Sequence, residues 1–193
     1  MNDQGYSLLE LLFVIAASIT SAGVAIPPLL TTLDHYRTAG AARYVAARIH
    51  RVRMEAIGRS THVALQFVQT PSGYAYVVHA DGNGDGVRSQ DINDGIDPPL
   101  SMVERLTDNF AGVNFDVLPD LPPVDPGGQP PGTDPIKLGT SNLLSYSATG
   151  TSSSGSLYIL GRRNVQYVVR VLGDTGRARV LRFDARSRQW KPL

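Results

Sequence analysis

Apolar side chains run almost without interruption from Tyr6 to Leu30, and Glu10 is the one charged residue in that stretch. As a helix, residues 6–30 would be about 37 Å long, which is enough to cross a hydrocarbon layer about 30 Å thick. The core of a signal peptide is shorter and follows basic residues, whereas residues 1–5 contain no Lys or Arg. The pattern therefore predicts a membrane-spanning helix over residues 6–30.

The helical pattern continues over residues 31–59. Apolar positions recur there every three or four residues and form one stripe of an amphipathic helix: Ala41, Val45, Ile49, Val52 and Ala56. Gly58 is suited to end a helix. We therefore expect one long helix whose second half buries a single face.

After the helix, the pattern changes to that of short strands. Seven segments rich in strand-forming residues are predicted to be β-strands: 62–68, 74–80, 100–106, 110–116, 156–161, 165–172 and 177–183. The last two are joined by a Gly-Asp-Thr-Gly hairpin turn at 173–176. Residues 117–135 hold seven of the thirteen prolines and are predicted to be a loop. Residues 60–193 thus form a β-rich globular domain, and the fold class is α+β, one long helix packed on an antiparallel sheet.

The N-terminus carries a processing motif. Gly5-Tyr6-Ser7-Leu8-Leu9-Glu10 resembles the N-terminus of type IV pilins and type II secretion pseudopilins, in which a membrane peptidase cuts after the glycine and methylates the new terminus. The resemblance implies a leader of residues 1–5, cleavage between Gly5 and Tyr6, and N-methylation of Tyr6. It also implies that Glu10 pairs with the N-terminal amine of a neighbouring subunit, and that Pro27 is the helix-kinking proline of pilins. A buried carboxylate is tolerable only when it is paired, so this pair would fix the register of assembly.

The C-terminal third is similar to one group of these proteins. Residues 146–150 and 154–158, followed by Thr175-Gly176-Arg177-Ala178-Arg179, look like the GspH/FimT group of minor pilins and pseudopilins. The resemblance implies the lollipop fold of type IV pilins, with a bacterial inner-membrane anchor and a periplasmic C-terminal domain. It implies as partners other pilin or pseudopilin subunits, the prepilin peptidase, the inner-membrane assembly platform and, before assembly, membrane lipid.

Two functions occur in that group, and the sequence leaves both open. One is a minor pseudopilin of a type II secretion system or type IV pilus machine, assembled near the tip of the filament. The other is a DNA-binding minor type IV pilin for natural transformation. The DNA hypothesis rests on Gly176, Arg177 and Arg179, which match a Gly-Arg-x-Arg element of FimT-like pilins, with Arg182 close by. Two arginines on one face of a strand could neutralise phosphates, although exposed arginines on a sheet are commonly only solvated.

The acidic loop 81–97 contains part of a calcium motif. Oxygen ligands at alternate positions and a following carbonyl match the opening of a calcium-binding loop: Asp81, Asn83, Asp85 and Val87. The closing acid expected at the twelfth position is replaced by Ile92, so Asp91, one residue early, or Asp94 would have to serve. The competing interpretation is a turn rich in Asp-Gly and Asn-Gly pairs. A structural calcium ion is the one cofactor that the sequence suggests.

Charge is segregated along the chain although the net charge is only +1. Residues 81–134 contain eleven acidic residues against two arginines, and residues 159–193 contain nine basic residues against two aspartates. This predicts an acidic face and a basic face. The chain has no cysteine, which excludes disulfides and thiolate chemistry. Its four histidines are scattered, which predicts no His/Cys metal site, and no nucleophile or phosphate-binding motif is present, so we do not expect an enzyme.

Overall fold

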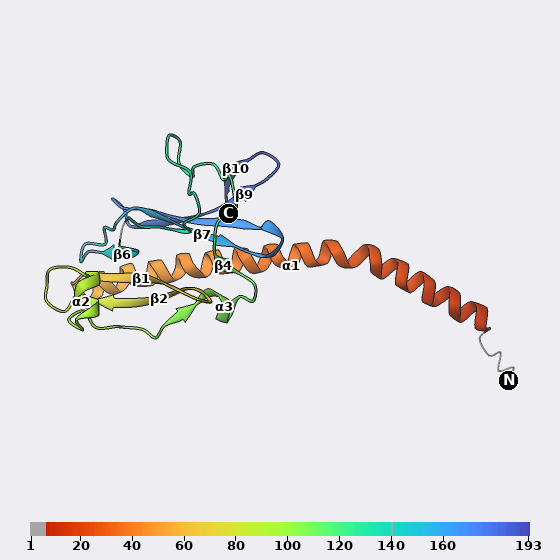
Figure 1. Cartoon of the computed structure of the whole chain (residues 1–193), viewed down its shortest axis with the longest axis horizontal. Helices are drawn as coiled ribbons and strands as arrows, with labels where there is room; N and C mark the ends of the chain where they lie inside the picture. The colour runs from red at the N-terminus through yellow and green to blue at the C-terminus, as the bar shows by residue number, and fades with distance from the viewer. Residues whose placement is uncertain (1–6, 140) are drawn as a thin grey trace.

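A computed structural model describes residues 7–139 and 141–193. A single long helix, α1 (Leu8–Arg59), passes through a β-rich head with its C-terminal half and projects from the head with its N-terminal half (Figure 1). The Ser7 hydroxyl caps its start by accepting a hydrogen bond from the Leu9 amide at 3.3 Å. Ser60, in the left-handed conformation, ends the helix just beyond Gly58. The predicted long helix is therefore confirmed over the described residues.

The head contains two antiparallel sheets, where the sequence predicted one. The strands are β1 (Val63–Thr70), β2 (Gly73–Ala80), β3 (Glu104–Arg105), β4 (Asn114–Phe115), β5 (Ile136–Lys137), β6 (Leu143–Tyr146), β7 (Gly155–Leu160), β8 (Gln166–Leu172), β9 (Arg177–Asp184) and β10 (Gln189–Pro192). The first sheet has the order β3-β2-β1-β6, and the second has the order β10-β9-β8-β7-β4, with β5 paired to β7. Three short helical segments complete the head: α2 (Ser89–Asn93), α3 (Leu106–Asn109) and the 3-10 turn η1 (Arg162–Asn164). The coarse prediction, a long helix packed on antiparallel sheet, is confirmed.

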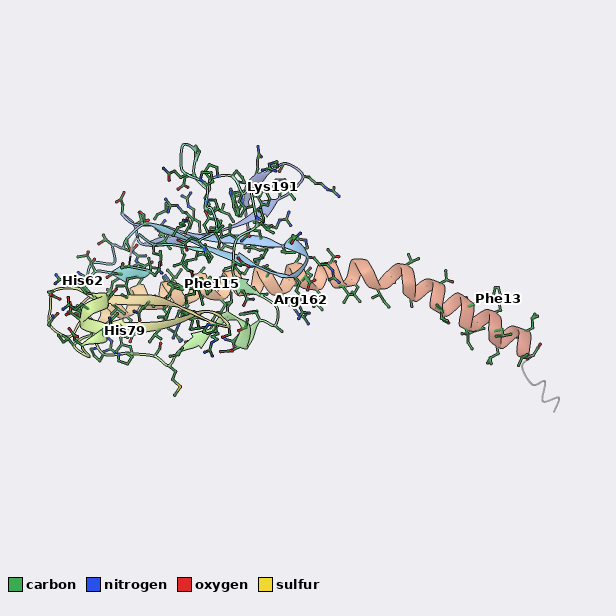
Figure 2. All side chains as sticks on the ribbon, viewed as in Figure 1. Phe13, His62, His79, Phe115, Arg162 and Lys191 are labelled. Carbon is green, nitrogen blue, oxygen red and sulfur yellow. The ribbon has the colours of Figure 1, made fainter. Side chains whose placement is uncertain are left out.

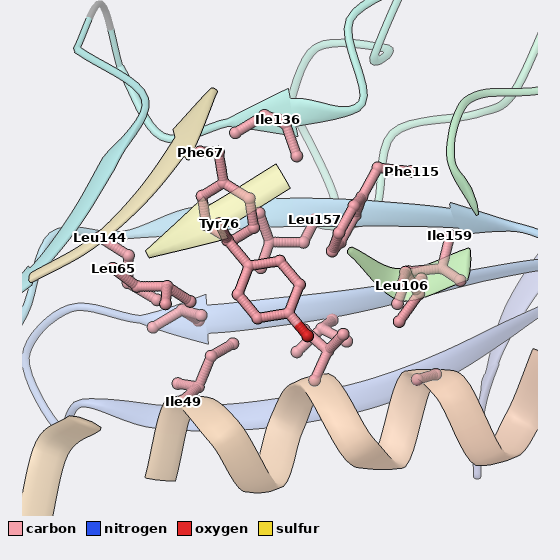
Figure 3. Close-up of a cluster of buried hydrophobic side chains, with 14 of the residues drawn as sticks. Ile49, Leu65, Phe67, Tyr76, Leu106, Phe115, Ile136, Leu144, Leu157 and Ile159 are labelled. Carbon is pink, nitrogen blue, oxygen red and sulfur yellow. The ribbon is translucent and has the colours of Figure 1, made fainter. Parts of the chain in front are cut away.

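The stripe predicted on α1 lies at the centre of the core. All five of its residues are at most 2% exposed. Aromatic side chains from both sheets meet beside this stripe (Figure 3). The ring of Phe115 lies edge-on to Phe67 and Tyr76, with centroids 5.4 and 6.2 Å apart. Since β4 and β1–β2 belong to different sheets, these rings join the two sheets around the helix, and each large buried side chain contributes about 1.5–3 kcal/mol.

A smaller apolar cluster covers the outer face of the second sheet. It is formed by Leu121, Tyr158, Val168, Phe183 and Trp190. The Trp190 indole donates to the Pro122 carbonyl at 3.0 Å, and Arg170 pairs with Asp125 at 2.7 Å. These contacts hold residues 117–135 against the sheet, and the segment has neither helix nor strand, as predicted.

Five predicted strands are confirmed, as β1, β2, β7, β8 and β9. The strands predicted at 100–106 and 110–116 were too long, because residues Leu106–Asn109 form α3 between them and leave only β3 and β4. The Asp108 carboxylate accepts a hydrogen bond from the Arg105 amide at 3.3 Å, which favours the helical turn at this place. Strands β5, β6 and β10 were not predicted.

Candidate functional site

The N-terminal half of α1 lies outside the head. Every side chain described between Ser7 and Leu33 is exposed, and the most apolar window of the helix has a mean hydropathy of 2.1. Figure 2 shows these side chains, Phe13 among them, pointing away from the helix on all sides. Soluble monomers rarely expose continuous apolar surface on this scale. The helix is long and apolar enough to span a membrane.

Polar side chains within this half satisfy their hydrogen bonds locally. The hydroxyls of Ser18, Thr20 and Ser21 each donate to the carbonyl four residues earlier, at 2.7–2.8 Å. A side chain whose donor is already satisfied costs less to place in hydrocarbon or in a packed helix bundle. The exposed polar groups here are therefore compatible with an apolar environment.

Glu10 lies in the first turn of α1 and is exposed. Within residues 7–139 and 141–193 it makes no ion pair. The positive end of the helix dipole favours an acid at this place, but only by about 0.3–1 kcal/mol. The predicted cleavage residues Gly5 and Tyr6 lie outside the described residues. So does the side chain of Pro27, although α1 continues through that position.

The candidate DNA-binding arginines lie at the start of β9. Arg177 and Arg179 are exposed and alternate with residues that pack on the main core. Both therefore project from the same face of β9, as predicted, and this is the outer face of the second sheet. Arg179 is paired in register with Arg170, whose charge is compensated by Asp125. Arg182 is separated from Arg179 by an odd number of positions along β9, so its side chain points to the opposite face of the sheet, the side of α1. The structure therefore brings Arg177 and Arg179 together but separates Arg182 from them.

Gly176 begins this strand with φ +60°. The Tyr146 hydroxyl donates to its carbonyl at 3.1 Å, and Arg53 Nε donates to the carbonyl of Gly150, also at 3.1 Å. The first bond ties the β8–β9 turn to β6, and the second ties residues 147–151 to α1. The glycine of the Gly-Arg-x-Arg element is thus explained by packing alone.

The candidate calcium loop is organised by its own backbone. The Asp81 carboxylate accepts hydrogen bonds from the amides of Asn83, Gly84 and Gly86 at 2.6–3.2 Å. Burial would raise the pKa of Asp81, but these amides together lower it below its ordinary value. The Asp85 carboxylate pairs with Arg88 at 2.7 Å. The Asn83 side chain accepts a hydrogen bond from the Asp85 amide at 3.2 Å. Three of the five predicted ligands are therefore already engaged in a turn, which is the competing interpretation of this segment.

Asp91 stands apart from that turn. Its Oδ2 atom is buried without a hydrogen-bond partner among the described residues. Desolvation, and then the charges of Asp85 and Asp97, raise the pKa of Asp91. Within the described parts of the chain, no three His, Asp or Glu side chains are arranged as a preformed metal site.

Asp97 is a member of this loop that sequence reasoning missed. It is 1% exposed, and its two carboxylate oxygens accept from the Gly82 and Arg88 amides, both at 3.0 Å. It therefore ties the end of the loop to its beginning. Its position directly before Pro98-Pro99, where the backbone must be extended, was the available signal.

The predicted acidic and basic faces are partly mixed in space. Glu104 on β3 pairs with Arg48 and accepts hydrogen bonds from the Tyr44 and Tyr76 hydroxyls at 2.8 and 3.3 Å. Burial, followed by the charge of Glu104, raises the pKa of Tyr76. This network fastens the edge of the first sheet to α1, so an acid from the acidic segment has a structural role.

Comparisons of the chain with protein-family models, with curated proteins and with solved structures found no match. Three features of the chain itself therefore bear on its function: the exposed apolar half of α1, the two arginines on β9 and the acidic loop after β2.

Proposed function

We propose that the protein is a minor pseudopilin of a type II secretion system or type IV pilus machine, cut by prepilin peptidase between Gly5 and Tyr6 and assembled near the tip of the filament. The observation that carries this proposal is the apolar half of α1, exposed on all sides, with Glu10 in its first turn. The apolar side chains of such a helix must be shielded from water. A bilayer shields them before assembly, and the helices of neighbouring subunits shield them in the filament.

Glu10 sets the axial offset between neighbouring helices in this packing. In the filament its carboxylate meets the N-terminal amine of a neighbouring subunit, and the two charges compensate each other in an apolar core. Apolar packing alone is non-directional and does not fix an axial offset. Small exposed residues on the same helix allow close approach of a second helix: Ala16, Ala17, Ser21, Ala22 and Gly23.

Processing is tested by the substitution Gly5→Ala in cells that contain a prepilin peptidase. We expect mass spectrometry of the membrane fraction to find wild-type protein that begins at a methylated Tyr6, and Gly5→Ala protein that retains its leader. Gly23→Ala is a matched control, because nothing lies within 4 Å of the added Cβ. A free Tyr6 terminus in the Gly5→Ala variant would contradict the assignment of the cleavage site.

A DNA-binding minor type IV pilin is the second candidate. It is favoured by the exposure of Arg177 and Arg179 on one face of β9, where neither makes an ion pair within the described residues. Two adjacent uncompensated guanidinium groups offer phosphate contacts without sequence preference. DNA would lie on the part of the outer face that stays exposed at the start of β9, beside residues 117–135.

We also propose that the loop after β2 binds a structural calcium ion through Asp81, Asn83, Asp85, the Val87 carbonyl and Asp91. The buried oxygen of Asp91, which has no hydrogen-bond partner within residues 7–139 and 141–193, and the like charges around it support this proposal. A divalent cation would compensate the like charges of these carboxylates, which repel one another in the calcium-free loop. Binding requires the carboxylates to turn toward one another, since they do not form a ready cage.

A further inference from the structure

A basic cleft lies where α1 leaves the head. It has a volume of about 400 Å³ and is bounded by α1, by η1 and by the turn that joins β9 to β10. Its lining includes His35, Arg163, Asn164, Arg182, Asp184 and Arg186. These residues are scattered over 150 positions of sequence, so only the fold brings them together.

The acids in and around the cleft are already compensated. Asp34 is buried and pairs with Arg163. Asp184 pairs with Lys191 and also accepts a hydrogen bond from the Arg186 amide at 3.0 Å. The cleft therefore keeps a positive excess after these pairs are counted.

Two guanidinium groups supply that excess. Arg182 lies beside the Tyr167 phenol, and neither Arg182 nor Arg186 pairs with an acid in residues 7–139 or 141–193. The Nδ1 atom of His35 is buried and has no hydrogen-bond partner among those residues. Counted over the described residues, the cleft thus offers an anion two guanidinium groups that have no acidic partner and one unsatisfied ring nitrogen.

The position of the cleft along α1 defines what anion it would meet. If residues 8–30 cross the hydrocarbon layer, His35 lies about 7 Å beyond the end of that segment, which is the depth of the phospholipid headgroups. Figure 2 shows Arg162, on η1, beside α1 at the edge of the head from which the helix projects. The basic side chains of this edge therefore face the plane of the headgroups.

We propose that this cleft binds the phosphate of an anionic phospholipid in the leaflet nearest the head. The inference rests on the proposed membrane anchoring of α1. Arg182 and Arg186 contact the phosphate oxygens, and His35 adds a hydrogen bond from the helix side. The contact fixes the orientation of the head while the subunit waits in the bilayer, and it is released when the subunit enters the filament.

Native mass spectrometry of the full chain in detergent tests this inference. Phosphatidylglycerol and phosphatidylcholine with the same acyl chains are added separately, and lipid retention is compared. We expect the wild type to prefer phosphatidylglycerol and Arg182→Gln/Arg186→Gln to lose that preference, by about fivefold for each arginine. Arg177→Gln/Arg179→Gln is the matched control, because it removes the same charge from the other face and the far end of β9.

Three outcomes would overturn the inference: equal retention of both lipids by the wild type, an unchanged preference in the cleft variant, or the same loss in the control. Displacement of phosphatidylglycerol by millimolar inorganic phosphate would show a general anion site and would also contradict the lipid assignment. The near-ultraviolet circular dichroism of Trp190, the single tryptophan, confirms that each variant is folded. Recovery of the wild type in the soluble fraction of cells would instead contradict the membrane anchoring, so the two failures are distinguishable.

Discussion

Gly176 packs directly against the carbonyl oxygen of Gly150: a Cβ at position 176 would lie 2.2 Å from that oxygen. The same Cβ would lie 3.1 Å from Arg53 Nε, which donates to that carbonyl. The glycine and the arginines of the Gly-Arg-x-Arg element therefore have different roles. The glycine positions the turn, and Arg177 and Arg179 point outward from it.

We predict that Gly176→Ala lowers the free energy of unfolding by about 3 kcal/mol or more, because the backbone clash adds to the strain of a positive φ. Gly84→Ala is the matched control. Gly84 also has a positive φ, +88°, but nothing lies within 4 Å of its added Cβ, so we expect a loss of only about 1 kcal/mol. Denaturant unfolding followed by Trp190 fluorescence measures both, and equal losses would show that the contact with Gly150 has no energetic role.

The DNA-binding candidate predicts a specific salt dependence. Fluorescence anisotropy of the full chain in detergent with a short duplex should show binding that weakens steeply with salt. Arg177→Gln/Arg179→Gln should reduce the slope of log K against log salt by about 2, since each lost phosphate contact removes about 0.9. Arg182→Gln, on the opposite face, should leave the slope unchanged. Absence of wild-type binding at low salt would remove this candidate.

Asp91 should destabilise the loop when no calcium is present. Its pKa in the folded protein is raised above 3.8, so its charged form is the less favourable one in the fold. The cost is present at pH 7 and disappears as the pH falls through the raised pKa. We therefore predict that Asp91→Asn raises the melting temperature at pH 7 in the presence of a chelator, and that this gain vanishes near pH 3. A variant that melts below the wild type at pH 7 would contradict this account.

Calcium should reverse the order of stability of the wild type and Asp91→Asn. At a hundredfold excess of calcium over its dissociation constant, the wild type should gain about 2.7 kcal/mol, and Asp91→Asn should lose most of that gain. Asp174→Asn, which changes an exposed acid outside the loop, should respond like the wild type. Melting curves with and without calcium decide the matter, and a wild type that does not respond would remove the calcium proposal.

The long helix could be predicted because its apolar residues repeat with the helical period, and each residue of the predicted stripe is buried. The segment 100–106, predicted to be a strand, pairs with β2 over only part of its length. The Leu100 amide donates to the Val78 carbonyl at 2.7 Å, but Met102 and Val103 turn outward and are 88% and 61% exposed. Strand propensity was therefore correct locally, and the sharp departure from β2 was set by the tertiary structure.

Other parts of the structure depend on partners that are distant in sequence. Strand β6 is only four residues long and is fixed by its pairing with β1, in which Tyr146 lies opposite Val63. Short segments of this kind carry too little pattern to be recognised. The cleft beside His35 was missed for the same reason, because its arginines come from η1, β9 and the β9–β10 turn.

Glu10 provides the most direct test of the central claim, that this chain is a subunit of a filament built on its apolar helix. The measurement is the amount of protein recovered in sheared filaments from cells that express the wild type, Glu10→Ala or the control Glu55→Ala. Glu55 lies on the same helix and pairs with Arg59, one turn away on the helix, at 3.0 Å.

In the proposed filament, loss of Glu10 would leave the amine of a neighbour unpaired in the apolar core, at a cost of about 3–5 kcal/mol. We predict that Glu10→Ala is processed normally but that its recovery is at least tenfold lower than that of the wild type. A tenfold difference corresponds to about 1.4 kcal/mol, which is well below that cost. We expect the recovery of Glu55→Ala to match that of the wild type. Equal recovery of Glu10→Ala and the wild type, or the absence of the wild type from filaments, would contradict the account.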